Sequence, residues 1–218
     1  MKNIVIYGAG GFAREVAYLI EHINEKNPQW NLLGYLDDNK ENYGKTMNEL
    51  PILGGLDWLE NESDIAIVVA VASPINKKKI VGNLNRFKNI EFPNLIHPTV
   101  KVSKFNELGK GNILCEGAIL TTNIILEDFI IINLNCTIGH DVHLKSYSTI
   151  LPNASISGNV IFEECVDFGT NATIIQGLTI GEGTIVGAGA VVVKNLPAYC
   201  TAVGAPAKPI KFHHLVEL

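Results

Sequence analysis

The fold of this chain is decided by the stretch Ile138-Gly-His-Asp-Val-His-Leu144-Lys-Ser-Tyr-Ser-Thr-Ile150-Leu-Pro-Asn-Ala-Ser-Ile156. An aliphatic residue returns at every sixth position, and mostly small or polar residues lie between. Apolar residues recur every three or four positions in an amphipathic helix and alternate in an ordinary half-buried strand, so neither structure explains this spacing. A period of six instead indicates a repeat architecture.

The same period extends over most of the C-terminal half. Sixteen successive sixth positions are apolar, namely Val102, Leu108, Leu114, Leu120, Leu126, Ile132, Ile138, Leu144, Ile150, Ile156, Phe162, Phe168, Ile174, Ile180, Val186 and Val192. At ordinary apolar frequencies, chance would produce this run on the order of once in a million for a given register. In proteins with a repeat of six residues, three hexads make one triangular coil. Residues 18 apart should therefore stack, and the sixteen hexads should form slightly more than five coils. The repeat alone carries no chemistry, and a rigid spacer remains an alternative at this point.

Residues 1–97 follow a different pattern, in which strands and helices alternate. Apolar runs predict strands at 3–7, 32–36 and 65–71, and apolar residues at helical spacing predict helices at 12–22 and 75–87. The third run is apolar throughout, as expected of a strand that is buried on both faces. We therefore expect a small parallel α/β domain at 1–97 and a repeat domain with a C-terminal tail at 98–218, joined by a short, stiff connection at Pro93 and Pro98.

A glycine-rich turn between the first strand and the first helix predicts an anion site. Gly8-Ala-Gly-Gly-Phe-Ala13 matches G-x-G-x-x-G/A, in which backbone N–H groups and a helix N-terminus favour a pyrophosphate. The 97 residues before the repeat are few for the two mononucleotide halves of an NAD domain, so a nucleotide diphosphate sugar fits better. The ligand crevice should lie beyond the carboxyl ends of the strands, at Gly10, Gly11, Asp37, Asp38, Ala72 and Ser73. Asp37 and Asp38 could accept hydrogen bonds from a base or ribose, or form only a solvated turn.

Composition excludes several classes of protein. The 218 residues include 47% hydrophobic residues, enough for a substantial core, and carry a formal net charge of -5. The only tight basic run is 77–79, so a nucleic-acid partner is disfavoured. There is no apolar stretch of 18 residues and the run at 4–7 is too short for a signal-peptide core, so we expect no membrane insertion and a cytoplasmic location. The widely spaced cysteines, which are Cys115, Cys136, Cys165 and Cys200, indicate neither a zinc knuckle nor a disulfide framework.

Among the histidines, His140 suits catalysis best. It follows a glycine and precedes Asp141 on the turn side of its hexad, where the carboxylate could fix the tautomer of an outward imidazole and raise its basicity. His143 should point elsewhere and is interpreted as surface or structural, and His97 as part of the linker. A zinc site would need histidines on successive coils, but Thr122 and Gly158 flank His140 there, so no metal is expected.

Five segments, taken in order, resemble a known family. They are Ile6-Tyr-Gly-Ala-Gly-Gly11, Leu36-Asp-Asp38, Asn94-Leu-Ile-His-Pro98, Ile138-Gly-His-Asp141 and Val203-Gly-Ala-Pro-Ala-Lys208. The chain resembles bacterial sugar acetyltransferases of the sialic-acid O-acetyltransferase type, which include N-acetyltransferases of UDP-linked 4-amino sugars and of GDP-perosamine. The resemblance implies a left-handed parallel β-helix that assembles as a homotrimer, with acetyl-CoA in a groove and the active site between neighbouring helices.

The resemblance also implies roles for individual residues. His140 corresponds to the general base, and Asp141, which assists it, replaces a glutamate found in some members. The nucleotide sugar would be bound by Gly10, Gly11, Phe12, Asp37, Asp38 and Ala72, although Ala72-Ser-Pro74 replaces the Gly-Asn of some relatives. Acetyl-CoA would be bound by Thr149, which replaces a second histidine of some relatives, and by Gly158, Thr170, Ala188 and Lys208.

The sequence leaves three functions open. The first is direct transfer of the acetyl group from acetyl-CoA to the 4-amino group of a nucleotide-linked amino-deoxy sugar, with a backbone N–H at the oxyanion. The second is O-acetylation of a sialic-acid-type sugar, which would use the same base and donor groove. The third is a non-catalytic trimer that binds a nucleotide sugar. A covalent route through Cys136 or Cys165 is disfavoured, because Cys136 lies at an interior corner where a thiolate is costly.

Overall fold

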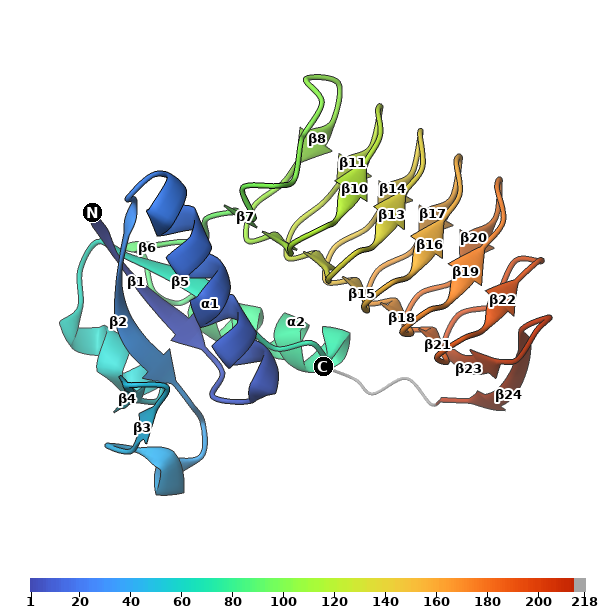
Figure 1. Ribbon diagram of the computed structural model, residues 1–218. Coiled ribbons are helices and arrows are strands. Elements are labelled where there is room, and N and C mark those ends of the chain that lie inside the picture. Colours follow the sequence, from blue (N-terminus) through green and yellow to red (C-terminus); the bar gives the residue numbers. More distant parts are fainter. Residues whose placement is uncertain (214–218) are drawn as a thin grey trace.

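The computed structural model describes residues 1–213 and consists of an α/β domain joined to a parallel β-helix (Figure 1). The α/β domain contains β1 (Lys2–Tyr7), α1 (Gly11–Lys26), β2 (Trp30–Leu36), η1 (Lys40–Asn42), β3 (Thr46–Met47), β4 (Leu50–Gly54), η2 (Leu56–Asn61), β5 (Ile65–Val69), α2 (Pro74–Leu84) and β6 (Ile90–Glu91). Its sheet has the order β3-β4-β2-β1-β5-β6, and all neighbours are parallel except β3 and β4. The predicted strands and helices are confirmed, with ends displaced by a few residues.

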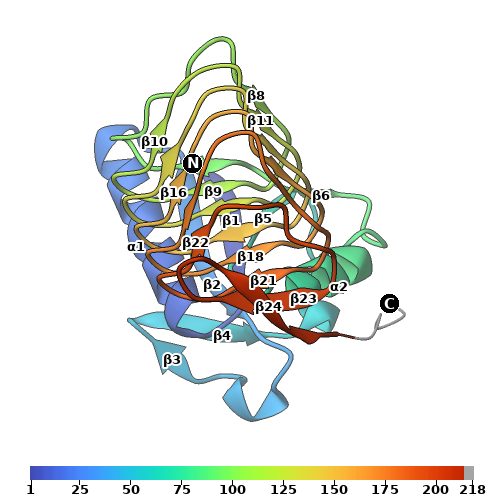
Figure 2. The ribbon, with the colours of Figure 1, turned by 90° about the vertical axis from the view of Figure 1, so that its right-hand side faces the viewer.

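The β-helix is built from three sheets, one on each side of a triangular coil, which Figure 2 shows end-on; the strands are parallel except for the last strand of the first sheet. The first sheet contains β7 (Leu95–Ile96), β9 (Ile113–Leu114), β12 (Ile131–Ile132), β15 (Thr149–Ile150), β18 (Asp167–Phe168), β21 (Ile185–Val186), β23 (Cys200–Val203) and β24 (Lys208–Phe212). The second contains β10 (Ile119–Leu120), β13 (Thr137–Ile138), β16 (Ser155–Ile156), β19 (Thr173–Ile174) and β22 (Val191–Val192). The third contains β8 (Glu107–Leu108), β11 (Ile125–Leu126), β14 (His143–Leu144), β17 (Ile161–Phe162) and β20 (Thr179–Ile180).

Residues that are 18 apart pair across successive coils, as the period of six predicts; Thr137, for example, pairs with Ser155. We call the turns from the first to the second sheet the first corner, those from the second to the third sheet the second corner, and those from the third back to the first sheet the third corner. From 109 to 190, the third residue of every four-residue corner has a positive φ, and it is most often Asn or Gly, which tolerate that conformation.

The repeating apolar residues fill the interior of the coil, together with the small or branched residues that end each corner. Val102 is an exception at 38% exposure, because it would stack on Leu120 and regular pairing in that second sheet begins only with β10. The β-helix also starts earlier than the expected boundary at 98, because β7 already pairs with β9.

The α/β domain covers the outward face of the first sheet. Leu95, Ile113 and Ile131 point away from the coil interior but are buried in one cluster with α1. At the third corner, beside the same sheet, Phe129 packs in a cluster with the α2 residue Leu84. The first sheet is therefore apolar on both faces at its N-terminal end, which fixes the glycine-rich turn and the β5 end beside the β-helix. Within residues 1–213 no helix is both long and apolar enough to cross a bilayer.

Candidate active site

His140 and Asp141 form a hydrogen-bonded pair at the second corner. The positive φ of Asp141 (58°) turns its carboxylate back toward the preceding residue, so that Oδ2 lies 2.7 Å from His140 Nδ1. Asn123, one coil earlier at the same corner, donates from Nδ2 to Asp141 Oδ1 at 3.3 Å. The hydrogen bonds from His140 and Asn123 lower the pKa of Asp141, which therefore stays ionised and holds His140 with Nδ1 as the donor. The other ring nitrogen, Nε2, is left to accept a proton.

Gly158 lies one coil beyond His140 and leaves room for its ring. A Cβ atom at Gly158 would lie 2.5 Å from His140 Cε1 and 2.6 Å from Nε2, so any larger residue would displace the imidazole. The His140 side chain is nonetheless 59% exposed, because it stands on the outside of the corner. The sequence therefore provides a fixed but accessible imidazole.

The glycine-rich turn leads directly into α1. Gly8 has φ +116, and a Cβ there would lie only 3.0 Å from the Ala70 carbonyl oxygen, so the turn must approach β5 closely. Gly10 is the N-cap of α1, and no atom lies within 4 Å of the place where its Cβ would be. The backbone is therefore uncovered on this side of Gly10, at a helix N-terminus of the kind whose free N–H groups bind phosphate. Phe12 lies partly buried against the core of the α/β domain.

The two aspartates that follow β2 have different roles. Asp37 Oδ1 accepts a hydrogen bond from the Asn39 backbone N–H at 2.7 Å and so shapes the turn. Asp38 is exposed and accepts a hydrogen bond from the Tyr7 hydroxyl. Burial and this bond to a carboxylate raise the pKa of Tyr7, so the hydroxyl remains a donor. Asp38 is therefore held at the same edge of the sheet as the glycine-rich turn.

Ala72 and Thr149 join the two domains. The Thr149 hydroxyl donates to the Ala72 carbonyl oxygen at 2.7 Å and accepts from Lys77 Nζ at 2.9 Å. Thr149 is fully buried at this junction. The prediction that Thr149 contacts acetyl-CoA does not fit the structure, because its hydroxyl is already committed. The Ala72 end of the crevice lies against the first sheet of the β-helix.

The remaining residues predicted to bind acetyl-CoA lie at a different corner from His140. Thr170 and Ala188 stack at the first corner, where Gly189 N–H donates to the Thr170 carbonyl oxygen at 2.8 Å. Lys208 is exposed on β24, which pairs with β23 at the end of the first sheet. Gly158 alone shares the second corner with His140. One chain thus presents two separate rows of predicted site residues. His140 and Gly158 form the row at the second corner, Thr170 and Ala188 form the row at the first corner, and the second sheet lies between them.

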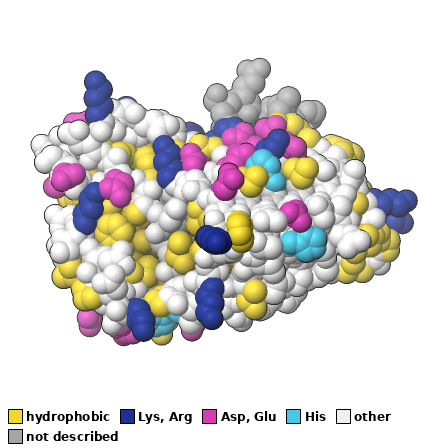
Figure 3. Space-filling view, turned by 90° about the horizontal axis from the view of Figure 1, so that it is seen from above, with side chains coloured by type: hydrophobic (Ala, Val, Ile, Leu, Met, Phe, Trp, Pro, Cys, Tyr) yellow, Lys and Arg dark blue, Asp and Glu magenta, His cyan; other side chains and the backbone are white. Residues whose placement is uncertain are grey.

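Other sequence interpretations can be compared with the structure directly. Cys136 and Cys165 are buried, and burial raises the pKa of each thiol to about 11, so neither offers a thiolate at neutral pH. His143 lies on the third sheet with Nε2 2.9 Å from Glu127 Oε1, a structural contact as predicted. The basic run does not form a patch, since Lys77 is buried and Lys78 pairs with Glu164 at 2.7 Å. The Lys and Arg side chains on the face shown in Figure 3 are dispersed among acidic and uncharged ones.

The sequence analysis misses three features. Tyr7 appears in it only as the end of a strand, although a hydroxyl just before the glycine-rich turn can reach the end of the next strand. Lys77 was read as part of a charged run, although it lies at helical spacing from the buried residues Val81 and Leu84 of α2. His97 was assigned to the linker, but it is buried and its Nε2 lies 2.8 Å from His22 Nδ1.

Comparison with known proteins gives matches over the whole chain. The family model described as PglD N-terminal domain matches residues 3–84. The GDP-perosamine N-acetyltransferase of Escherichia coli O157:H7 is 29% identical over 213 residues, which are 94% of this chain and 95% of the relative.

Two solved structures superpose closely. The acetyltransferase domain of PglB from Neisseria gonorrhoeae FA1090, in complex with acetyl coenzyme A, has a TM-score of 0.87 at 32% identity and covers 96% of this chain and 99% of its own. PerB from Caulobacter crescentus, in complex with CoA and GDP-perosamine, has a TM-score of 0.87 at 27% identity and covers 97% of this chain and 98% of its own.

Proposed function

Because the chain belongs to the family of hexapeptide-repeat acetyltransferases that act on nucleotide-linked amino sugars, we propose that it transfers acetyl from acetyl-CoA to the 4-amino group of such a sugar, with His140 as general base. The observation that carries this proposal is the His140 imidazole, which Asp141 holds at Nδ1 and which Gly158 leaves room for. A hydroxyl acceptor would use the same base, but the relative from Escherichia coli that matches nearly the whole chain is an N-acetyltransferase.

In the proposed reaction the lone pair of the sugar nitrogen attacks the thioester carbonyl carbon. His140 Nε2 takes the proton that the nitrogen loses, and Asp141 stabilises the resulting imidazolium. When the tetrahedral intermediate collapses, the carbon–sulfur bond breaks and the proton passes from His140 to the leaving thiolate. The products are the acetamido sugar and CoA, and no acyl-enzyme is formed.

We further propose that the nucleotide lies across the glycine-rich turn, with its diphosphate at the N-terminus of α1 near Gly10 and Gly11 and its ribose or base at Asp38. The open first turn of α1 and the exposed carboxylate of Asp38 support this placement. The sugar would then extend toward Ala72, where the crevice meets the first sheet.

The working enzyme is proposed to be a homotrimer in which acetyl-CoA lies between two chains. His140 and the pair Thr170 and Ala188 lie at different corners of one chain, so a second copy is needed to bring the two rows together. The surface around the second sheet exposes large apolar side chains, with Ile119 at 58% exposure and Leu134 at 40%. A contact between copies would bury these side chains.

The primary test is release of CoA thiol with a panel of acceptors, namely GDP-perosamine, UDP- and dTDP-linked 4-amino-6-deoxy sugars, and sialic acid. Release with one amino sugar should fall at least about a hundredfold in His140→Ala. His143→Ala is the matched control and should retain activity, because that ring contacts Glu127 instead. Activity with sialic acid alone would assign O-acetylation, and release with none of the acceptors would favour a binding protein.

The trimer is tested by mixing two inactive variants. Chains with His140→Ala and chains with Asp38→Ala, unfolded together and refolded, should regain part of the activity if one site uses residues of both chains. Equal inactivity of the mixture and of the separate variants would contradict the shared site, provided that each variant refolds to the same oligomer by light scattering.

A further inference from the structure

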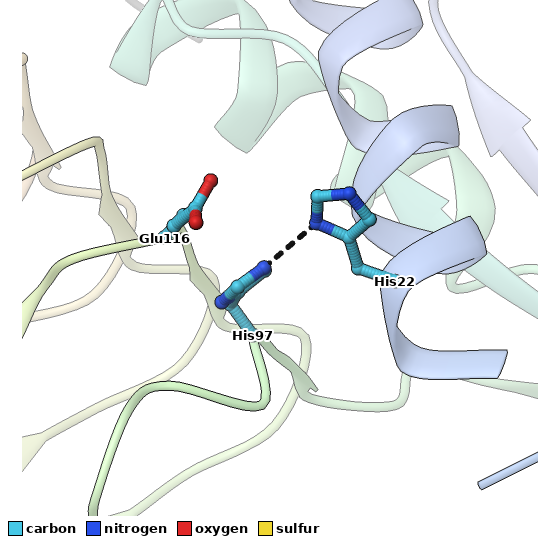
Figure 4. Close-up of side chains that lie close together, drawn as sticks. All are labelled: His22, His97 and Glu116. Carbon is cyan, nitrogen blue, oxygen red and sulfur yellow. Dashed lines mark hydrogen bonds between the residues drawn. The ribbon is translucent and has the colours of Figure 1, made fainter. Parts of the chain in front are cut away.

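Three side chains that can bind a metal converge where α1 meets the β-helix. They are His22 of α1, His97 directly after β7, and Glu116 at the first corner (Figure 4). One ligand atom from each of the three lies within 4.8 Å of the others. Because the residues come from separate segments, their convergence is a property of the folded chain, which the sequence spacing did not reveal.

His97 is held firmly in place. Its Nδ1 lies 2.8 Å from the Thr99 hydroxyl oxygen, and that hydroxyl also accepts a hydrogen bond from the Gly117 backbone N–H. The other nitrogen, Nε2, points at His22 Nδ1 at 2.8 Å. Nδ1 also accepts a hydrogen bond from the Thr99 backbone N–H at 3.3 Å, which places the proton on Nε2 in this structure. A metal at Nε2 would require that proton to move to Nδ1, where the Thr99 hydroxyl oxygen can accept it. Metal-binding histidines commonly have a partner of this kind on their second nitrogen.

The surroundings of the cluster also suit a cation. Glu116 is exposed and supplies one negative charge. A pocket lined by Tyr18, Leu134 and these three residues opens beside them, so a water molecule has access as a further ligand. Cys115 lines the same pocket, but burial raises its pKa to about 12, so it stays a thiol.

The side chains must move to admit the ion. Ligand atoms bound tetrahedrally at about 2.05 Å lie about 3.3 Å apart, compared with 2.8 Å between the His22 and His97 nitrogens and up to 4.8 Å within the cluster. His22 is only partly buried and Glu116 is exposed, so shifts of about 0.5 to 1.5 Å in these two side chains need not disturb the core.

We propose that His22, His97 and Glu116 bind one divalent transition-metal ion of the Zn²⁺ type per chain, with water as the fourth ligand. Two imidazoles, a carboxylate and a water form a set that Zn²⁺ favours. The ion would tie α1 to the first turn of the β-helix, so that the α/β domain is held against the coil. This role is separate from general-base catalysis by His140, which lies at another corner, and the test below reads metal content and not acetyl transfer.

The test uses untagged protein that has been stripped with a chelator, given Zn²⁺ or Co²⁺, and passed through gel filtration. We expect about one ion per chain by elemental analysis, visible d–d bands from bound Co²⁺, and a higher melting temperature with Zn²⁺. His22→Gln and Glu116→Gln each replace a side chain that is not buried, so both variants should fold, and each should weaken metal binding by at least about tenfold.

His143→Gln is the matched control, because it removes a histidine that contacts a carboxylate elsewhere on the chain. Its metal content should equal that of the wild type. The proposal is overturned if the stripped wild type takes up no stoichiometric metal, in which case His22 and His97 are a hydrogen-bonded pair only. It is also overturned if His22→Gln binds metal as tightly as the wild type.

Discussion

Replacing Gly158 with alanine should reduce catalysis through His140 while leaving the fold intact. The three atoms nearest to the added Cβ all belong to the His140 ring, at 2.5 to 3.0 Å, and no backbone atom is closer. An ordinary carbon–carbon contact is about 3.5 to 4.0 Å, so the ring must move by about 1 Å. Because His140 stands on the surface of the corner, it can make this movement at little cost in stability.

A displacement of about 1 Å at a catalytic group can lower the rate by about a hundredfold. We therefore expect kcat for Gly158→Ala to fall by roughly that factor, with the melting temperature within about 2 °C of the wild type. The assay is steady-state CoA release with the preferred amino sugar. Gly82→Ala is the control, because a Cβ at that position meets no atom within 4 Å.

The decisive measurement is the same substitution in the His140→Ala background. If the alanine acts by displacing the ring, it should change the residual rate by less than about twofold, since the ring is already absent. A hundredfold loss in that background as well would refute the reasoning and assign Gly158 a direct role with the donor, visible as a higher KM for acetyl-CoA. An unchanged kcat for Gly158→Ala alone would show that His140 does not work from this position.

Three further predictions concern Asp141, Cys136 and Lys77. Asp141→Asn should lower kcat at least about tenfold with little change in KM, because the hydrogen bond that orients His140 loses its charge; steady-state kinetics measures this. Cys136→Ala should leave kcat within about twofold and reduce the free energy of unfolding by about 1 kcal/mol in urea titrations, because the buried thiol packs in the core and donates to the Leu151 carbonyl oxygen. Burial lowers the pKa of Lys77 to about 7, whereas in the unfolded chain the lysine keeps its proton to about pH 10. Above pH 7 the protein therefore takes up a proton when it unfolds. The free energy of unfolding should accordingly rise with pH, by up to about 1.4 kcal/mol per unit between pH 7 and about 8.5. Lys77→Met should flatten that rise, and an equal slope in both proteins by urea unfolding would contradict the prediction.

The periodic parts of the fold could be predicted because their cause is local. The buried residue at every sixth position and the glycine-rich turn before α1 each follow from a few neighbouring residues. The corner residue His140 could be singled out for the same reason, because its partner Asp141 is adjacent in the sequence.

Contacts between distant segments could not be predicted in this way. The predicted role of Thr149 rests on its position nine residues after His140, whereas its partners Ala72 and Lys77 are more than 70 positions away. The same limitation concealed His22 and His97, which lie 75 positions apart. One signal was present: Leu95, Ile113 and Ile131 are apolar at the outward position of three successive strands of the first sheet, whereas on the second sheet Ile119 is followed by Thr137 and Ser155. Such a switch indicates that another part of the chain covers that side.

The stacking of residues 18 apart limits which insertions and deletions this protein can accept during evolution. Removing or adding a whole coil of 18 residues would keep each corner in line with its neighbours, as Thr137 and Ser155 are aligned now. A change of six would also preserve the buried pattern, but it would rotate every later hexad by one side of the triangle. Thr170 and Ala188 would then leave the first corner, while His140 stayed at the second. Length variation among homologues should therefore occur in whole coils, or as loops that leave a corner and return to it.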